Sequence, residues 1–412
     1  MHTNPDASLN ESIGLRDAIG RSRHELTTPA LLLDLPVVRR NITRMAARTR
    51  GPTRLRPHVK SHKSAEIARL QIEAGAIGLT AATVWEAAAM AAAGMDDRLI
   101  ANEVVGEEKI RCLAAIARNT RVTVAVDHVR NAEALSAAAG TVGAKIGVLI
   151  DVDVGLGRCG VRTEQEARTL AERVRSLPGL DLRGVMGYEG HCALESDRGT
   201  RAANVRIAME RLLAVVDALQ SAGFPVEIVS AGGTGTFDLT GRHPGVTELQ
   251  AGSYVFMDSS RTDLVPDFEA GLTVLATVAS RYRTTVVLDC GKKTVGVDFK
   301  PPRIVGEAAR VRYVSEEHTV FDVDSDCGLE LGQRVELLPS YCPTTINLHD
   351  VYYVVQDGVV IDMWPVLARG PGRGGWHEQV FRQGGAGDGG GAGDRTGDRR
   401  EVRGGGGEGM RP

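Results

Sequence analysis

The segment RPHVKSHK, residues 56–63, places a lysine that could act as a nucleophile among several other basic side chains. It follows a short apolar run and precedes a helical pattern, so Lys60 is expected where a strand ends. The neighbouring arginine, histidines and second lysine should oppose protonation of the Lys60 amine. A deprotonated amine attacks aldehydes, which makes Lys60 a candidate Schiff-base lysine. The alternative is a solvated basic turn, because charge clusters also perturb lysines that have no catalytic role.

A loop rich in glycine and hydroxyl side chains, SAGGTGT at residues 230–236, is a second feature with chemical meaning. Because it opens toward a helical pattern, its backbone N–H groups and hydroxyls could hold a phosphate group. A Gly-rich loop alone is weak support, since glycine also simply makes turns. Three further polar side chains, Arg158, Tyr188 and His191, also follow short apolar runs. The fold must bring these groups together if they are to form one site.

Short apolar runs alternate with amphipathic stretches of helical periodicity between residues 29 and 260. Strands that alternate with helices imply right-handed crossovers and a parallel sheet. About eight such units in roughly 230 residues fit a closed (β/α)8 TIM-type barrel better than an open sheet. An open dinucleotide-binding sheet would also need a GxGxxG pattern after the first run, and none follows it. The eight runs are 30–35, 53–56, 77–81, 98–101, 122–126, 145–150, 182–186 and 226–229.

The chain changes character after about residue 263, where short β-rich runs separated by turns replace the alternating pattern. One of these turns, Asp357-Gly358, is a hairpin signal. We therefore predict an α/β protein with a barrel and a C-terminal, mostly antiparallel β domain. A Gly-rich tail with few apolar residues should be disordered, because it cannot bury enough surface. The expected boundaries are 1–27 for a lead-in, 28–262 for the barrel, 263–375 for the β domain and 384–412 for the tail.

Composition restricts the function. A net charge of −3 argues against nucleic acid or an anionic membrane surface as the main partner. No apolar run is long enough to span a bilayer, and the N-terminal 25 residues lack a secretory apolar region. The six cysteines are scattered without a CxxC pair, which favours reduced thiols in the cytoplasm over a disulfide framework. These features favour a cytoplasmic protein whose main partner is neither nucleic acid nor a membrane.

In a TIM-type barrel, the chemistry takes place at the carboxyl ends of the strands. Lys60 follows the second apolar run, Arg158 the sixth, Tyr188 and His191 the seventh, and the Gly-rich loop the eighth. An amine, an arginine, an aromatic side chain and a phosphate cradle on one rim describe a site for pyridoxal 5′-phosphate (PLP). In this interpretation Lys60 forms the Schiff base and the loop binds the phosphate.

The chain resembles the D-threonine aldolase and D-serine dehydratase family, which has the PLP-binding barrel and β domain of alanine racemase. The resemblance covers about residues 28–370. The motifs that carry it are RPHVKSHK at 56–63, GLGRCGV at 155–161, GYEGH at 187–191, SAGGTGT at 230–236, ELQAGSYVFMD at 248–258, LDCGKK at 288–293 and SEEH at 315–318. The resemblance also implies a homodimer.

The resemblance assigns a role to each matching residue. It implies that Lys60 is the Schiff-base lysine and that Arg158 lies near the phenolic oxygen of the cofactor. Tyr188 would face the pyridine ring, and His191 would lie beside the substrate. Asp258 would help to close the site. The residues around the phosphate would be Ser230, Gly232, Gly233, Thr234 and Tyr254.

One segment departs from the family pattern. The family's lyases hold a divalent metal with a His-x-Asp or His-x-Cys pair in a segment that ends in Asn-Leu. In an ungapped alignment from Asn347-Leu348, Tyr341 replaces the histidine and Pro343 replaces the carboxylate or thiolate. A proline side chain cannot bind a metal and a neutral phenol is a poor ligand, so we expect no metal at these positions. An alternative ligand set lies close by: Cys342, His349 and Asp350.

The loss of this pair has a chemical consequence. In the family the metal acts as a Lewis acid on the β-hydroxyl of the substrate. Without a metal, PLP still acidifies the α-carbon. A tyrosine from the β domain is an acid–base group in the related alanine racemases, so Tyr341 is a candidate for the same role opposite Lys60. The alternative is that Tyr341 only fills the space of the missing ligand.

Three functions are compatible with these features. The resemblance favours a PLP-dependent lyase that cleaves or dehydrates a D-β-hydroxy amino acid, with His191 or a group of the β domain as base. The second is a metal-independent amino acid racemase or epimerase that uses Lys60 and Tyr341. The third is a PLP carrier without turnover.

Overall fold

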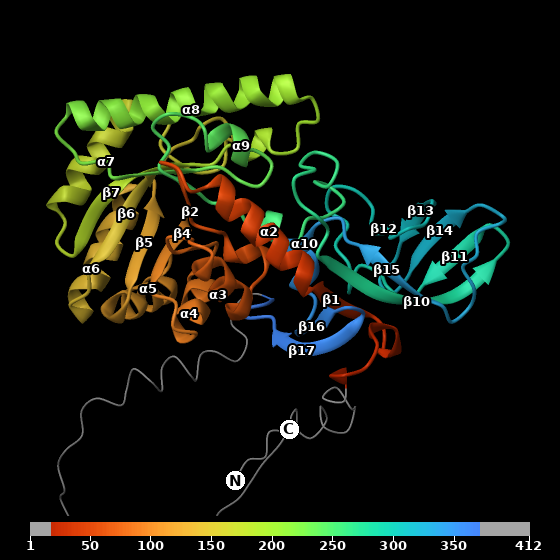
Figure 1. Ribbon diagram of the computed structural model, residues 1–412. Coiled ribbons are helices and arrows are strands. Elements are labelled where there is room, and N and C mark those ends of the chain that lie inside the picture. Colours follow the sequence, from red (N-terminus) through yellow and green to blue (C-terminus); the bar gives the residue numbers. More distant parts are fainter. Residues whose placement is uncertain (1–17, 371–412) are drawn as a thin grey trace, which may run out of the picture. The chain divides into compact units, whose positions relative to one another are not determined.

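The computed structural model describes residues 18–370. These residues form a barrel sheet of parallel strands and a second, mostly antiparallel sheet (Figure 1). The predicted fold class is therefore confirmed. The Gly-rich tail at 384–412 and most of the lead-in at 1–27 lie outside the described residues, and the boundary near residue 262 stays a prediction.

Within residues 18–370, eight parallel strands form the barrel sheet in the order β2-β9-β8-β7-β6-β5-β4-β3. The two ends of this order are joined, because Ile77 N donates to Leu55 O at 2.9 Å and Thr80 N donates to Pro57 O at 2.8 Å. The strands are β2 (Arg54–Leu55), β3 (Leu79–Ala81), β4 (Asp97–Glu103), β5 (Arg121–Val126), β6 (Ile146–Asp151), β7 (Leu180–Gly187), β8 (Ile228–Ala231) and β9 (Glu248–Leu249).

Helices cover the outside of the barrel sheet, and side-chain caps fix where they begin (Figure 1). At the start of α7, Thr163 Oγ1 accepts a hydrogen bond from Glu166 N at 3.1 Å, and the Glu166 carboxylate accepts one from Thr163 N at 3.2 Å. No helix within residues 18–370 is long and apolar enough to cross a membrane. The helices are α2 (Leu35–Arg48), α3 (Ala65–Glu73), α4 (Val84–Ala92), α5 (Glu107–Asn119), α6 (Val129–Val142), α7 (Glu164–Ser176), α8 (Arg198–Ser221) and α9 (Phe237–Thr240).

The second sheet has the order β13-β14-β11-β10-β1-β16-β17, and β15 joins β10 to β12. Asp357 and Gly358, both with positive φ, form the predicted hairpin turn between β16 and β17. The elements are β1 (Ala30–Asp34), β10 (Leu272–Tyr282), β11 (Thr285–Leu288), β12 (Arg303–Ile304), β13 (Ala309–Val314), β14 (Thr319–Val323), β15 (Arg334–Leu338), α10 (Cys342–Ile346), β16 (Val351–Gln356) and β17 (Val359–Pro365).

Two strand assignments from the sequence need correction. The first apolar run is not a barrel strand: it forms β1, which pairs antiparallel with β10 and parallel with β16 in the second sheet. The eighth barrel strand is instead β9, which pairs with β8 and β2. A buried central strand has the same apolar sequence in either sheet, and the two residues of β9 do not stand in an apolar run. Lys60 therefore follows the first barrel strand, and the Gly-rich loop follows the seventh.

Candidate active site

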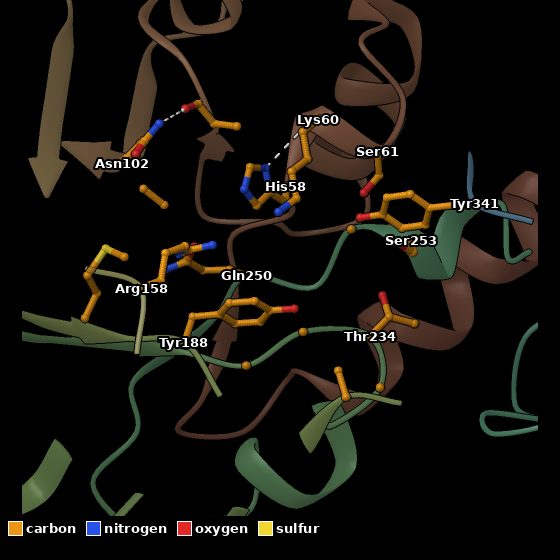
Figure 2. A pocket seen from close by; sticks show the side chains of 18 of the residues that line it. His58, Lys60, Ser61, Asn102, Arg158, Tyr188, Thr234, Gln250, Ser253 and Tyr341 are labelled. Atoms are coloured by element: carbon orange, nitrogen blue, oxygen red, sulfur yellow. Dashed lines mark hydrogen bonds between the residues drawn. The ribbon is translucent and has the colours of Figure 1, made fainter. Parts of the chain in front are cut away.

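Lys60 lies in a single 3-10 turn, Val59–Ser61, which follows barrel strand β2. His58 caps this turn, because its Nδ1 accepts a hydrogen bond from Lys60 N at 3.5 Å. The Lys60 side chain extends into a pocket of about 280 Å³ at the carboxyl ends of the barrel strands (Figure 2). This volume is near the lower end of the range for small-molecule sites.

The other basic side chains of this segment have partners of their own. The Arg56 guanidinium bonds to Glu248 at 3.0 Å and to Asp97. Lys63 Nζ pairs with Glu86 at 2.7 Å and lies outside the pocket lining. Burial also lowers the pKa of both histidines, that of His62 to about 3, so their rings carry no charge near neutral pH. The expectation that these neighbours oppose protonation of Lys60 is therefore wrong.

Tertiary structure perturbs the Lys60 amine instead. The pKa of Lys60 is lowered to about 8, mainly by burial. The charge of Glu86 opposes this shift, and the charges of Arg158 and Arg261 contribute to it. With that pKa, about a tenth of the amine is neutral at pH 7. The structure thus provides a lysine that can attack an aldehyde, although for another reason than the sequence indicated.

Tyr188 and Arg158 lie near the Lys60 amine. Lys60 Nζ and Arg158 Cζ are each 5.9 Å from the centroid of the Tyr188 ring. A Cβ atom on Gly233 would lie 3.2 Å from Tyr188 Cε2, so a glycine keeps the space beside the ring open. Burial raises the pKa of Tyr188 to about 12, which keeps its hydroxyl protonated. These residues leave room for a planar ring within reach of an amine.

Gly232, Gly233 and Thr234 of the Gly-rich loop line the same pocket. Thr234 Oγ1 accepts a hydrogen bond from Tyr254 N at 2.9 Å, which leaves its hydroxyl hydrogen for another partner. Gly232 has a φ of +80°, a conformation that favours glycine. The N–H groups of Gly232 and Gly233 donate inside the loop, to Glu189 and to Thr236 Oγ1. The loop therefore presents the Thr234 hydroxyl to the pocket, where a phosphate could accept a hydrogen bond from it.

A buried carboxylate that the sequence analysis missed holds this loop. Glu189 is fully buried, and its carboxylate accepts a hydrogen bond from Gly232 N at 3.1 Å. It also accepts hydrogen bonds from Thr236 Oγ1 at 2.6 Å and Thr240 Oγ1 at 2.5 Å. The sequence offered one sign of this role: Glu189 is a charged residue that stands between Tyr188 and a glycine. Glu189 acts through the loop and is a positioning residue.

Tyr341 and Arg261 form another wall of the pocket. In Figure 2 the Tyr341 hydroxyl points into the pocket from the side opposite Arg158. The Arg261 Cζ atom is 4.9 Å from the centroid of the Tyr341 ring, and Phe299 packs edge-on against the same ring. Burial raises the pKa of the Tyr341 phenol, and the charge of Arg261 opposes this effect.

Two known families match the chain. The alanine racemase N-terminal domain matches residues 33–260, and the putative serine dehydratase domain matches residues 271–355. D-Threonine aldolase of Arthrobacter sp is 39% identical over 351 residues, which are 83% of this chain and 93% of that protein. 3-Hydroxy-D-aspartate aldolase of Paracoccus denitrificans (strain Pd 1222) is 36% identical over 370 residues, which are 86% of this chain and 95% of that protein.

Solved structures agree with these matches. The crystal structure of D-threonine aldolase from Filomicrobium marinum superposes with a TM-score of 0.83 at 35% identity, and the match covers 86% of this chain and 98% of that one. The chain belongs to the D-threonine aldolase family. Its relatives are lyases of D-β-hydroxy amino acids, which supports the lyase interpretation over the racemase. The family depends on PLP. The Lys60 amine, the open space beside the Tyr188 ring and the Gly-rich loop of this pocket fit that cofactor.

The structure does not bring every predicted site residue of the D-threonine aldolase pattern into the pocket lining. Lys60, Arg158, Tyr188, Gly232, Gly233, Thr234 and Tyr341 line it. The other four do not line it. Asp258 is fully buried and accepts hydrogen bonds from Arg261, which does line the pocket. Ser230 is buried and accepts a hydrogen bond from Gln250 Nε2 at 2.9 Å. The Tyr254 hydroxyl is directed to Gln71 Nε2, at 2.9 Å, so only its backbone N reaches the loop. His191 is exposed and lies against Gly155.

The two positions at which the resemblance implies metal ligands, Tyr341 and Pro343, do not fit a metal here. Pro343 offers no ligand atom, and Tyr341 offers only a phenol with a raised pKa. The alternative metal ligands named from the sequence, Cys342, His349 and Asp350, do not form a common site. The Cys342 thiol donates to Met257 O at 3.0 Å, and His349 Nε2 lies 2.8 Å from Thr294 O.

A separate acidic cluster lies beside the pocket. In the part of the chain that the structure describes, one group of three potential metal ligands lies within 4.8 Å: Glu103, Asp127 and Cys159. Close by, burial and the neighbouring Glu103 raise the pKa of Asp151 to about 8. Nothing in the described part of the chain shows that these three residues bind a metal ion.

Several pocket residues had no role in the sequence analysis. The most important is Arg261, a residue that is only 7% exposed. It follows the ELQAGSYVFMD motif by three residues, so its position next to a family motif was the available signal. Its nearness to Lys60 and Tyr341 depends on tertiary structure and could not be inferred. Other such residues include Asn102, Cys159, Gln250 and Ser253.

Proposed function

We propose that this protein is a PLP-dependent lyase that cleaves the Cα–Cβ bond of D-β-hydroxy amino acids, among them D-threonine, which would give glycine and acetaldehyde. The observation that carries the proposal is the Lys60 amine. Its pKa is about 8, and it faces the Tyr188 ring and shares a pocket with the Gly-rich loop. Membership of the D-threonine aldolase family supplies the reaction class.

Each of these pocket residues would have a separate role in binding the cofactor or in the reaction. Lys60 would attach the cofactor, Arg158 would bind its ring oxygen, and residues 232–234 would bind its phosphate. PLP bound there would supply an electron sink for the α-carbon of the substrate. Once released from the cofactor, the Lys60 amine would stand close to the α-carbon and could move a proton. The walls formed by Tyr188 and Tyr341 would exclude water.

One observation favours racemisation as a second candidate. Tyr341 and Lys60 line the same pocket, and the Tyr341 hydroxyl points into it (Figure 2). A racemase needs two acid–base groups on opposite faces of the α-carbon. Dehydration is the other route open to a lyase of this family, since the second matching family is a putative serine dehydratase domain.

The test is the identification of products. Purified protein reloaded with PLP would be incubated with D-threonine, L-threonine and D-serine. We expect glycine and acetaldehyde from D-threonine and no cleavage of L-threonine. Lys60→Met should abolish turnover, and Lys292→Met, which removes an exposed lysine, should not. Pyruvate and ammonia from D-serine alone would indicate dehydration. Inversion at the α-carbon would indicate racemisation, and unchanged substrate without α-hydrogen exchange would indicate a PLP carrier.

Two further expectations complete the proposal. A homodimer is proposed from the resemblance to the family, and its mass can be measured by light scattering after gel filtration. A cytoplasmic location is proposed because all six cysteines are free thiols, as is usual in a reducing compartment. Localisation of a tagged chain would test it.

A further inference from the structure

Arg261 is a buried cation at the site of chemistry, and one edge of it is held in place. Its Nη1 donates to the two carboxylate oxygens of Asp258 at 3.0 and 3.2 Å and to Ser260 Oγ at 2.9 Å. Asp258 is fully buried. These contacts fix the guanidinium from one side, so little of its conformational freedom remains to be lost during a reaction.

The other edge of the guanidinium is available. Within residues 18–370, Arg261 Nε and Nη2 make no hydrogen bond to a protein atom, although Arg261 lines the pocket. The Arg261 Cζ atom also lies 4.9 Å from the Tyr341 ring centroid. Two kinds of donor, N–H groups on a cation and a phenol O–H, thus stand together on the wall that Tyr341 forms.

The same place does not suit a divalent ion. Of the two positions where the family has metal ligands, one carries Pro343 and the other Tyr341. A metal-bound tyrosine has to lose its proton, and burial raises the pKa of this one. The neighbouring carboxylate, Asp258, already accepts hydrogen bonds from Arg261 and Ser260. A cation bound to the Tyr341 oxygen would also be close to the Arg261 charge.

We propose that Arg261 and Tyr341 replace a metal ion in this protein, so that the β-hydroxyl of the substrate is polarised by a guanidinium and a phenol. This inference rests on the proposed lyase function. The two groups would donate hydrogen bonds to the β-oxygen and stabilise the negative charge that develops on it. Donors of this kind need no proton transfer of their own, so a protonated Tyr341 is the active form.

The reaction balances without a further reactant. The proton of the β-hydroxyl passes to the free Lys60 amine, the Cα–Cβ bond breaks, and the β-carbon leaves as an aldehyde with a new C=O bond. The electron pair of the broken bond stays with Cα. Lys60 returns the proton to Cα, which gives glycine. Arg261 and Tyr341 end the cycle in the state in which they began.

The experiment compares metal binding and cleavage in the same preparation. The PLP-loaded protein would be dialysed against EDTA, and Mn²⁺ and Zn²⁺ would be titrated into it by calorimetry. Cleavage of D-threonine would be measured before and after each addition. We expect no stoichiometric binding and a kcat that changes less than twofold. Stoichiometric binding together with cleavage only in the metal-loaded protein would overturn the inference and leave the lyase function intact. Absence of cleavage in every sample would refute the lyase function itself.

Variants test the two side chains directly. Tyr341→Phe keeps the ring against Phe299 and removes one donor, so kcat should fall about 10²–10³-fold with little change in KM. Arg261→Lys keeps the charge but loses the planar geometry, and kcat should fall about tenfold or more. Tyr313→Phe, the same change on an exposed residue, is the matched control and should have no effect.

The visible absorption of bound PLP would show that each variant still folds and holds the cofactor. A rise in KM for Arg261→Lys with an unchanged kcat would contradict the inference, because it would assign Arg261 to binding of the substrate carboxylate. Full turnover by Tyr341→Phe would contradict it as well.

Discussion

Capture of PLP by Lys60 should have a pH profile that reports the burial of this amine. Only a neutral amine attacks an aldehyde, so the rate of capture is proportional to the neutral fraction of Lys60. With a pKa of about 8, this fraction rises tenfold per pH unit below pH 8 and becomes constant above it. At pH 7 about a tenth of the amine is neutral, against about one part in 3,000 for an unperturbed lysine. Capture should therefore be about 300-fold faster than at an exposed lysine of equal reactivity.

The assay is a stopped-flow mixing of the cofactor-free protein with PLP between pH 6.5 and 9.5, followed by the absorption of the bound cofactor. The pKa values of His58 and His62 lie below this range, so the two rings stay neutral throughout. Arg261→Met removes a cation that lowers the pKa of Lys60, so it should move the plateau to higher pH. A rate that climbs tenfold per unit up to pH 9.5 would refute the reasoning, because it would mean an ordinary lysine.

Three other outcomes follow from the described residues. Glu189→Gln removes a buried charge that holds the Gly-rich loop, so the PLP dissociation constant should rise about tenfold to a hundredfold in an equilibrium titration. Gly78→Ala would place a Cβ atom 2.2 Å from Arg56 Nη1 at a φ of +154°, and should lower the free energy of unfolding by about 2–4 kcal/mol in urea. Gly140→Ala, in a helix with open space around it, is the control and should be neutral or slightly stabilising. Lys60→Met should stabilise the cofactor-free protein, and this gain should shrink by about 2 kcal/mol between pH 7 and pH 9.5. The reason is that the pKa of Lys60 is about 8 in the folded protein and 10.5 in the unfolded chain, so the buried charge destabilises the folded state. This destabilisation is at its full value below pH 8 and disappears toward pH 10.5.

The barrel could be predicted because its strands and helices have clear periodicity. Seven of the eight apolar runs mark barrel strands β2 to β8. Which sheet a run joins is a different question, since it depends on partners far away in the sequence. The first run pairs with β10 and β16, more than 200 residues later, and nothing local to residues 30–34 indicates this. Strand β9 was missed because its two residues, Glu248 and Leu249, do not stand in an apolar run, whereas the equally short β2 lies in the run 53–56.

The site was predictable where residue type alone limits the chemistry. The sequence shows three such features at strand ends: a lysine, a Gly-rich loop and an aromatic residue. Each can be recognised without knowing the fold, and all three line the pocket. Residues that act through tertiary contacts were not predictable. Glu189 holds the loop through hydroxyls about 50 residues away, and Arg261 meets Tyr341 across 80 positions of sequence. Wrong neighbours were also assigned to Lys60, because Arg56 and Lys63 each have a carboxylate partner.

The second sheet contributes to the site as directly as the barrel does. Tyr341 directly precedes α10, after β15 of that sheet, and the Tyr352 hydroxyl of β16 donates to the His62 carbonyl in the segment that carries Lys60. Leu367 N donates to Lys63 O at 2.7 Å, just beyond β17. The barrel therefore supplies the amine and the phosphate loop, while the second sheet fixes the amine-bearing turn and provides the phenol. Because one sheet both holds Lys60 in place and presents Tyr341, a change in its packing should affect cofactor capture and cleavage together.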